Sequence, residues 1–140
     1  MMQPCPYPIE DILFHAPPMI LIDEVEGYDE ETVISSVTIR DTSPFLEDGV
    51  LPSYVGIEYM AQSIAAYSGI KARNQGGDVK IGYLVSARNL TLETPNFKIG
   101  DKLEITVQLV YNEVPMAVFD CAITKNKALV AKARVNVYQP

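Results

Sequence analysis

The sequence predicts an α+β domain in which an antiparallel sheet of about six strands curls around one long helix. Residues 54–73 are helix-compatible and apolar on nearly every face, and such a helix is buried on most sides. Four segments rich in Val, Ile, Leu, Thr and Tyr follow it, separated by short turns, which is the spacing of an antiparallel meander. We expect residues 1–140 to form one domain around one core.

The N-terminal part predicts one short helix and two strands. "IEDILF" (9–14) is amphipathic but too short for more than a small helix, and two prolines stop it. "MILID" (19–23) is typical of the start of a strand. "ETVISSVTIR" (31–40) alternates apolar and polar side chains, as a half-buried strand does. The prolines, aspartates and glycine of 41–52 indicate an irregular loop.

The long helix has clear predicted ends. Ser53 is expected to be its N-cap, and Gly76 and Gly77 its C-terminal stop. The strands after it are expected within 80–93, 101–112, 115–126 and 128–139. A single curved sheet leaves strand edges and one flank of the helix uncovered, so a homodimer or an association with a similar chain is expected.

Composition argues against several classes of protein. The net charge of −7 does not suit a nucleic-acid partner, and no apolar run is long enough for a transmembrane helix. The N-terminus lacks the basic residues of a signal peptide. Cys5 and Cys121 follow no metal-binding spacing, so we expect a reduced, cytoplasmic protein without a metal site.

The charges are unevenly distributed along the chain. Residues 1–70 hold twelve acids and one base, and residues 71–140 hold six acids and ten bases. This asymmetry predicts a local basic patch at Lys71, Arg73, Lys80 and Arg88 on an otherwise acidic protein. The alternative is that these side chains lie in solvated loops and bind no partner.

A carboxylate, Glu58, stands near the start of the apolar helix. Burial of an isolated charge is costly, but the helix N-terminus favours a negative charge, and Gln62, four residues on, could hold the carboxylate. Free N–H groups around Ser53 would suit a thioester carbonyl or a developing oxyanion. A carboxylate in such a cleft is suited to proton transfer. The alternative is a glutamate that reaches solvent or pairs with an arginine.

This chemistry needs a second acid–base group. His15 is the one histidine of the chain, and it directly precedes "APPM". It is therefore the candidate base. The alternative is a histidine that packs or caps and has no part in the chemistry.

Three motifs resemble those of β-hydroxyacyl-(acyl carrier protein) dehydratases, which have the hot-dog fold. "HAPPMILIDEV" is similar to their "HR-P-LLVDRV" opening, "GVLPSYVGIEYMAQ" to their "MPG-L-IEALAQ" helix entry, and "FKIGDKLEITVQL" to their "V-PGD-L" turn. The helix, "VGIEYMAQSIAA", and the ending, "VFDCAITKNKALVAKARVNVYQP", more closely resemble a branch associated with aryl polyene biosynthesis. The resemblance extends over essentially the whole chain.

The resemblance implies dehydration of a 3-hydroxyacyl thioester to a trans-2-enoyl thioester, in polyene or fatty-acid-like chain building. The family's acid falls at Glu58, its carbonyl-polarising N–H at Ser53 and its supporting glutamine at Gln62. The substrate would arrive on the phosphopantetheine of an acyl carrier protein, in a tunnel between two subunits, without a metal or redox cofactor. Lys71, Arg73 and Arg88 are the candidate contacts with that acidic carrier.

One position departs from the family pattern. The family's catalytic histidine stands in an "HFPG" motif fourteen residues before the acid, where this chain has Pro44, and proline cannot transfer a proton. Either His15 acts as the base, or the chain is a degenerate subunit that pairs with an active dehydratase. Family members that keep "HFPG" also have a histidine at the His15 position, which favours a structural role there. Thioester hydrolysis is a third possibility, because this fold also hosts it.

Overall fold

A computed structural model describes residues 2–15, 18–80 and 82–140. The elements in chain order are α1 (Ile9–Ile12), β1 (Glu24–Tyr28), β2 (Thr32–Thr38), β3 (Val50–Pro52), a 3-10 turn (Ser53–Val55), α2 (Gly56–Asn74), β4 (Tyr83–Leu92), β5 (Asn96–Lys98), β6 (Lys102–Glu113), β7 (Met116–Lys125) and β8 (Ala128–Tyr138).

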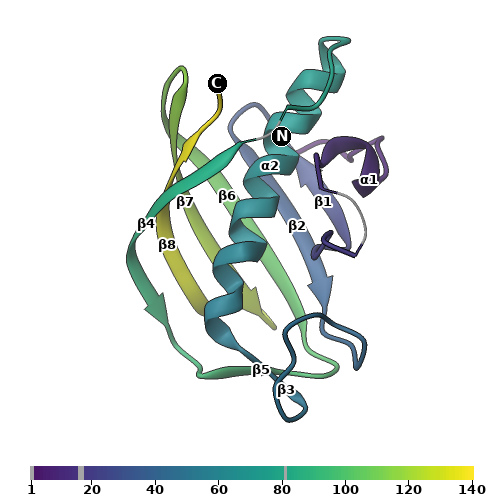
Figure 1. The fold of residues 1–140 in the computed structure, drawn as a ribbon, viewed down its shortest axis with the longest axis vertical. Helices are drawn as coiled ribbons and strands as arrows, with labels where there is room; N and C mark the ends of the chain where they lie inside the picture. Colours follow the sequence, from purple (N-terminus) through teal and green to yellow (C-terminus); the bar gives the residue numbers. More distant parts are fainter. Residues whose placement is uncertain (1, 16–17, 81) are drawn as a thin grey trace.

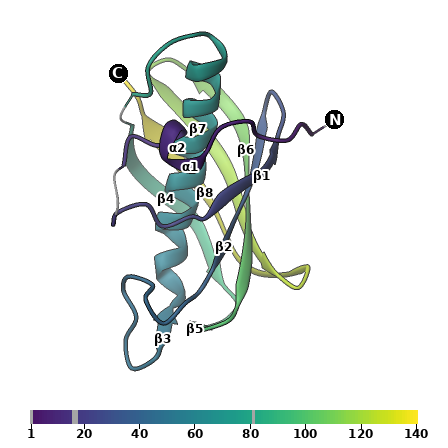
Figure 2. The same cartoon turned by 90° about the vertical axis from the view of Figure 1, so that its right-hand side faces the viewer.

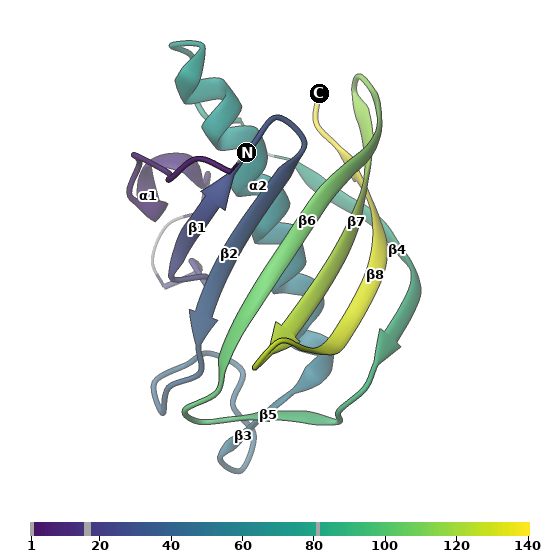
Figure 3. The same cartoon turned by 180° about the vertical axis from the view of Figure 1, so that it is seen from behind.

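Six strands form one antiparallel sheet in the order β1-β2-β6-β7-β8-β4. The sheet curves around α2, which lies along one face of it (Figures 1 and 2). Seen from behind, the other face of the sheet carries none of the helices that the described residues form (Figure 3). The predicted α+β architecture, a long helix held in a curved six-stranded sheet, is confirmed, and it is the hot-dog fold.

The core lies between this sheet and α2. Register pairs Val33 with Val107, Val107 with Cys121 and Cys121 with Ala133, and all four side chains are buried. The intervening residues, such as Asp120, point to the opposite face. This period-two pattern explains why residues 31–40 and the later strands could be predicted from their alternation.

The segment that leads into α2 differs from its prediction. Residues 50–52, expected to be irregular, form β3 and pair with β5. The pairing brings the Pro95 carbonyl to Ser53, whose N–H donates to it at 3.0 Å. Ser53 therefore begins the 3-10 turn, and Val55 is the N-cap of α2, without a side-chain cap. The prediction of Ser53 as the N-cap is wrong, whereas the stop at Gly76, with a φ of 76°, is confirmed.

Residues 19–23 also differ, because no strand includes them. The Leu21 N–H donates to Gln62 Oε1 at 2.7 Å, and Gln62 Nε2 donates to the Met19 carbonyl at 2.7 Å. The buried amide of Gln62 thus takes the place of a neighbouring strand and ties this stretch to α2.

α1 packs closely on α2 through a glycine. A Cβ on Gly69 would lie 1.8 Å from the Ile12 carbonyl oxygen, so no larger residue fits without displacing α1. Ile12 itself is fully buried. This contact fixes the end of α1, from which the chain continues to Phe14 and His15.

One edge and one flank are left uncovered, as predicted. β4 ends the sheet, and Tyr83, Leu84 and Val85 on it are all more than 40% exposed. At the N-terminal end of α2, two side chains of the uncovered flank are exposed. They are Tyr54, in the 3-10 turn before the helix, and Glu58, in the first turn of the helix. Within the described ranges, no helix has the length and apolar character needed to cross a membrane.

Candidate functional site

Glu58 and His15 line one cavity of about 260 Å³. The cavity lies between α2, the segment after α1, the start of β4 and the end of β8. Its other lining residues are Phe14, Ala61, Ile64, Ala65, Ser68, Lys80, Gly82, Tyr83, Leu84, Val137 and Gln139. We call it the Glu58 cavity. Most of its wall is apolar, and its ionisable side chains are the two candidate proton carriers and Lys80.

Helical spacing aligns the floor of this cavity. Glu58, Ala61, Ala65 and Ser68 follow one another at intervals of three or four residues, so they form one stripe along α2. Glu58 lies in the first turn of the helix, closer to the N-terminus than the sequence indicated, where the helix dipole favours its negative charge most. Small side chains along the rest of the stripe leave room for a ligand.

Glu58 is exposed in the single chain, so the expectation of a deeply buried carboxylate is wrong for the chain alone. The stripe that carries it faces away from the core and toward the uncovered flank. A partner subunit over this flank would enclose the carboxylate, which the chain alone leaves open to water.

His15 reaches the cavity because the chain is held on both sides of it. Upstream, Ile12 is locked against Gly69. Downstream, Gln62 binds the backbone of residues 19 and 21. The two residues between His15 and Pro18 lie outside the described ranges.

Two predicted supports of Glu58 are engaged elsewhere. The N–H of Ser53 donates to Pro95, so it is not the unpaired donor that the sequence predicted. Both Gln62 and Glu58 belong to the described chain, and no hydrogen bond joins them, because the Gln62 amide binds the backbone of residues 19 and 21. Both expectations are wrong in the folded single chain.

The predicted basic patch is dispersed. Arg73 Nε donates to the Asp11 carbonyl at 2.9 Å and joins α2 to α1. Arg88 pairs in register with Arg134, which binds Asp120 on the face of the sheet remote from α2. Lys71 and Lys80 remain together, because both line a second cavity of about 490 Å³. We call this the lysine cavity.

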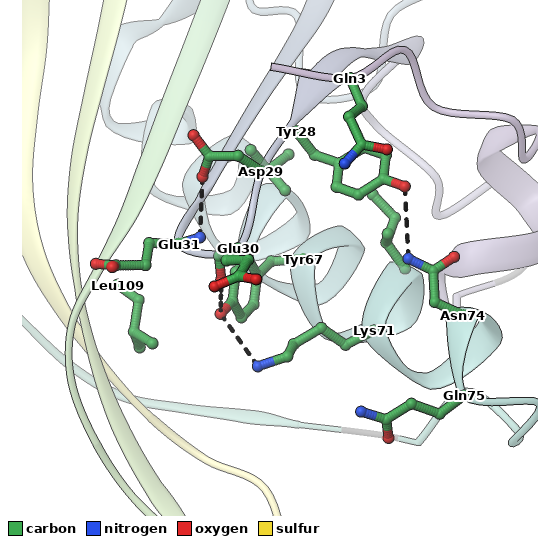
Figure 4. A pocket seen from close by; sticks show the side chains of 12 residues that line it. Gln3, Tyr28, Asp29, Glu30, Glu31, Tyr67, Lys71, Asn74, Gln75 and Leu109 are labelled. Carbon is green, nitrogen blue, oxygen red and sulfur yellow. Dashed lines mark hydrogen bonds between the residues drawn. The ribbon is translucent and has the colours of Figure 1, made fainter. Parts of the chain in front are cut away.

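A third cavity, of about 510 Å³, lies on the other side of Lys71, between α2 and the β1–β2 turn (Figure 4). There the Tyr67 hydroxyl donates to the Glu30 carbonyl at 2.7 Å. The Lys71 ammonium lies 3.5 Å from the same hydroxyl and 5.4 Å from the Tyr67 ring centroid. Lys71 is thereby held at the border between this acidic cavity and the lysine cavity.

Pro44 takes no part in the Glu58 cavity. It is exposed in the loop between β2 and β3 and does not line that cavity, so the histidine position of the β-hydroxyacyl dehydratases contributes nothing to the cavity of the same chain. This agrees with a site to which a second subunit contributes.

Two further groups can be excluded as reactive residues at neutral pH. Burial, helped by the charge of Asp23, raises the pKa of Tyr59 to about 12. Burial, helped by Asp120, likewise raises the pKa of the Cys121 thiol to about 12. Tyr59 is therefore a neutral core residue, and Cys121 is not a nucleophile.

Sequence reasoning did not assign Phe14, Tyr83 or Lys80 to the site around Glu58. Lys80 was expected only as part of a surface patch, and no role was predicted for Phe14 or Tyr83. Phe14 adjoins His15, which was a usable signal. Nothing in the local sequence reveals that the start of β4 returns to the stripe on α2.

Comparison with known proteins agrees with this geometry. A model of the ApeP-like family, described as ApeP dehydratase, matches residues 7–140. No curated protein matches the chain.

Among solved structures, the chain is similar to one from the dehydratase heterocomplex ApeI:P of Xenorhabdus doucetiae. The two are 30% identical over 96% of this chain and 91% of that chain, with a TM-score of 0.92. A hypothetical thioesterase from Streptococcus pneumoniae, solved with coenzyme A, is 16% identical over 84% of each chain, with a TM-score of 0.65. The PaaI protein of E. coli is 17% identical over 82% of this chain and 81% of that one, with a TM-score of 0.64.

The last two likenesses concern the fold alone. The family match, by contrast, spans almost the whole chain and includes Glu58, His15 and the cavity that they share. The chain belongs to the ApeP-like dehydratase family.

Proposed function

We propose that the chain dehydrates a 3-hydroxyacyl thioester carried by an acyl carrier protein, giving a trans-2-enoyl thioester in aryl polyene or related chain building. The observation that carries the proposal is the single cavity lined by Glu58 and His15. A dehydration needs one group to take a proton and another to give one, and both stand at this cavity.

In the proposed reaction, His15 takes the proton from C2 of the acyl chain. The electron pair forms the C2–C3 double bond, the C3–O bond breaks, and Glu58 gives its proton to the hydroxyl, which leaves as water. The proton taken by His15 then returns to Glu58 through solvent. The elimination is redox-neutral, and it needs no metal or redox cofactor.

Charge that develops on the thioester carbonyl lies near the N-terminal turn of α2 in this arrangement. Because the N–H of Ser53 donates to Pro95 and that of Gly56 donates to carbonyls of the 3-10 turn, the proposal assigns the polarisation of the carbonyl to the dipole of α2. The apolar wall formed by Phe14, Leu84 and Val137 would exclude water from the acyl chain.

The proposal includes a second hot-dog subunit. The similar solved structure comes from a dehydratase heterocomplex, and this chain has Pro44 where the β-hydroxyacyl dehydratases have a histidine. The uncovered edge strand β4, with Tyr83 and Val85 exposed, is suited to pairing with an equivalent strand. A partner placed there would cover the flank on which Glu58 lies. The free thiols of Cys5 and Cys121 suit a cytoplasmic setting.

A second candidate function follows from Pro44. In it, the chain is a non-catalytic subunit, and the partner supplies the histidine and the turnover. This chain would then contribute shape, and Glu58 at most. His15 would have the structural role that its place between two anchored segments also allows.

One experiment separates these functions. A carrier-bound 3-hydroxyacyl chain is incubated with this protein alone, with a hot-dog partner that has the family histidine, and with both, and the products are weighed by mass spectrometry. Loss of one water with this protein alone supports the proposed dehydratase. Loss of water only in the presence of the partner, at the rate of the partner alone, supports the non-catalytic subunit. Release of a free thiol without enoyl product would identify a thioesterase and refute both.

A further inference from the structure

We propose that β4 accepts a non-identical hot-dog subunit that places a carboxylate against Arg88, and that Arg88 disfavours the pairing of two copies of this chain. This inference rests on the second subunit of the proposed function, and it adds the feature by which that subunit is selected. The feature lies on the outer face of the sheet, by which we mean the face remote from α2.

β4 is the open edge of the sheet. In the part of the chain that the structure describes, this strand has a neighbour, β8, on one side only (Figure 3). The β1 edge is partly closed, because the backbones of Gln3 and Tyr28 exchange two hydrogen bonds of 2.7 and 2.9 Å. An open edge is suited to the addition of a strand. Apolar side chains on β4 that are between 38% and 56% exposed would be covered by it: Tyr83, Leu84, Val85, Leu90 and Leu92.

Register places Arg88 on the outer face at this edge. Ala87 pairs with the buried Val135 and packs against the core. Successive side chains of a strand point to opposite faces, so Arg88 projects from the outer face, where it is exposed. There it lies directly opposite Arg134 of β8.

These two arginines have one carboxylate between them. Asp120 accepts two hydrogen bonds from Arg134, of 2.8 and 3.0 Å. Among the described residues, no acid forms an ion pair with Arg88. Like charges directly opposite each other on neighbouring strands are destabilising. The chain alone therefore leaves the Arg88 guanidinium beside a like charge, and a carboxylate from outside would relieve it.

Pairing of two copies would add to this repulsion. Two copies of one strand pair about a twofold axis, and residues that oppose each other share a face, so the axis passes through a residue. If the whole of β4 pairs, that residue is Ala87 or Arg88, the two at its centre. Arg88 then lies directly opposite its own copy or on the diagonal from it, about 5–8 Å away in either case.

A subunit with an aspartate or glutamate at the equivalent position would turn this repulsion into an ion pair. The apolar side chains of β4 are covered equally well by either kind of partner. Apolar contact therefore supplies the association, and the charge at Arg88 supplies the choice between partners.

The test uses Arg88→Glu as the acidic partner, because it has the shape of the native chain and differs at this charge. Native chain and isotope-labelled Arg88→Glu are mixed, and native mass spectrometry counts both homodimers and the mixed dimer. Each like-charged contact costs roughly two- to fivefold in affinity, and exchange of the two homodimers for mixed dimers removes two such contacts. The exchange constant should therefore exceed its statistical value by about four- to 25-fold.

Two further measurements isolate the charge. Arg88→Gln should self-associate about two- to fivefold more tightly than the native chain in analytical ultracentrifugation. Salt at about 1 M should return the mixed dimer to its random share, because exposed charges are screened. Both substitutions change an exposed side chain, so the unfolding midpoint in urea should stay native.

Lys127→Glu is the charge-matched control. Lys127 is exposed in the turn between β7 and β8, outside the stretch of β8 that pairs with β4. Mixed with the native chain, it should give the random share of mixed dimer. An equal excess in this control, or a random share in the mixture with Arg88→Glu, overturns the inference.

Two other results also overturn it. A native homodimer that Arg88→Gln does not tighten would show that a second copy is the occupant of β4. Monomers in every sample would show that β4 does not pair with a hot-dog subunit, and that Arg88 only guards an exposed edge.

The measurement needs no substrate, so it is independent of the proposed reaction. An excess of mixed dimer from a chain that dehydrates no thioester supports the selection by Arg88, and only the proposed reaction fails. Dehydration together with a random share of mixed dimer supports the proposed reaction and rejects the selection.

Discussion

Glu58 and His15 stand 43 residues apart in the sequence and line the same cavity of the folded chain. Helix α2 positions Glu58 directly, in its first turn. The position of His15 depends on two tertiary contacts. Gly69 packs against Ile12 before it, and Gln62 binds the backbone of residues 19 and 21 after it. The proposed acid is therefore placed by local structure, and the proposed base by packing.

Replacement of Glu58 by glutamine should remove turnover and leave the fold intact. The amide cannot give a proton to the leaving hydroxyl, and we expect kcat to fall by about 10²- to 10⁴-fold. Glu58 is exposed, so the melting temperature should stay within a few degrees of the native value. Glu104→Gln, on the remote face of the sheet, is the matched control. A native rate in Glu58→Gln would reject the acid.

Replacement of His15 by asparagine tests the base separately. We expect kcat to fall by about 10²-fold or more, and the unfolding midpoint in urea to be unchanged because the side chain is exposed. Rates are measured with and without the hot-dog partner. If His15→Asn keeps the native rate, the base comes from the partner subunit, and His15 is structural.

Replacement of Gln62 by methionine should destabilise the fold. The substitution preserves volume but leaves the Leu21 N–H and the Met19 carbonyl without their partner. An unsatisfied buried group costs about 1–3 kcal/mol, so the free energy of unfolding in urea should fall by about 2–5 kcal/mol. Gln108→Met, exposed on β6, should change it by less than about 0.5 kcal/mol. A variant that keeps its stability but loses activity would restore the role next to Glu58 that the sequence indicated.

Replacement of Gly69 by alanine tests the close approach of α1 and α2. Alanine favours a helix by about 1 kcal/mol over glycine, but its Cβ would lie 1.8 Å from the Ile12 carbonyl oxygen. We expect a net loss of about 1–3 kcal/mol in the free energy of unfolding, together with lower turnover as His15 moves. In the control, Gly77→Ala, the new Cβ has its nearest neighbour at 3.5 Å. An equal or greater stability of Gly69→Ala would show that α1 is not held in this way.

Patterns among residues close in the sequence predicted the fold, whereas contacts between residues far apart in the sequence determine the details of the site. The helix and five of the six strands of the large sheet could be predicted from periodicity and composition. The failures at Ser53 and Gln62 have a different cause. Pro95 lies 42 residues after Ser53, and Met19 lies 43 residues before Gln62. Each of these contacts occupies a hydrogen-bond donor or acceptor that the local sequence predicted to be free. Lys80 was missed at the Glu58 cavity for the same reason.

The stability of the β5–β6 turn should depend on pH through Asp101. Burial alone would raise the pKa of Asp101, but the N–H of Lys98, at 2.8 Å, and the Lys125 ammonium, at 3.0 Å, together lower it. The carboxylate therefore stabilises the folded state above its unfolded pKa of about 3.9. This stabilisation is lost as the pH falls through the folded-state value.

Urea unfolding of the native chain and of Asp101→Asn measures this dependence. At about pH 7 the variant should be the less stable of the two, because asparagine cannot form the ion pair with Lys125. The difference should shrink as the pH falls below about 4 and the native carboxylate takes up its proton. Asp41→Asn, an exposed aspartate in the loop after β2, should show no such difference. If the difference between the native chain and Asp101→Asn does not shrink as the pH falls, the effect of the substitution comes from the lost hydrogen-bond geometry and not from the charge.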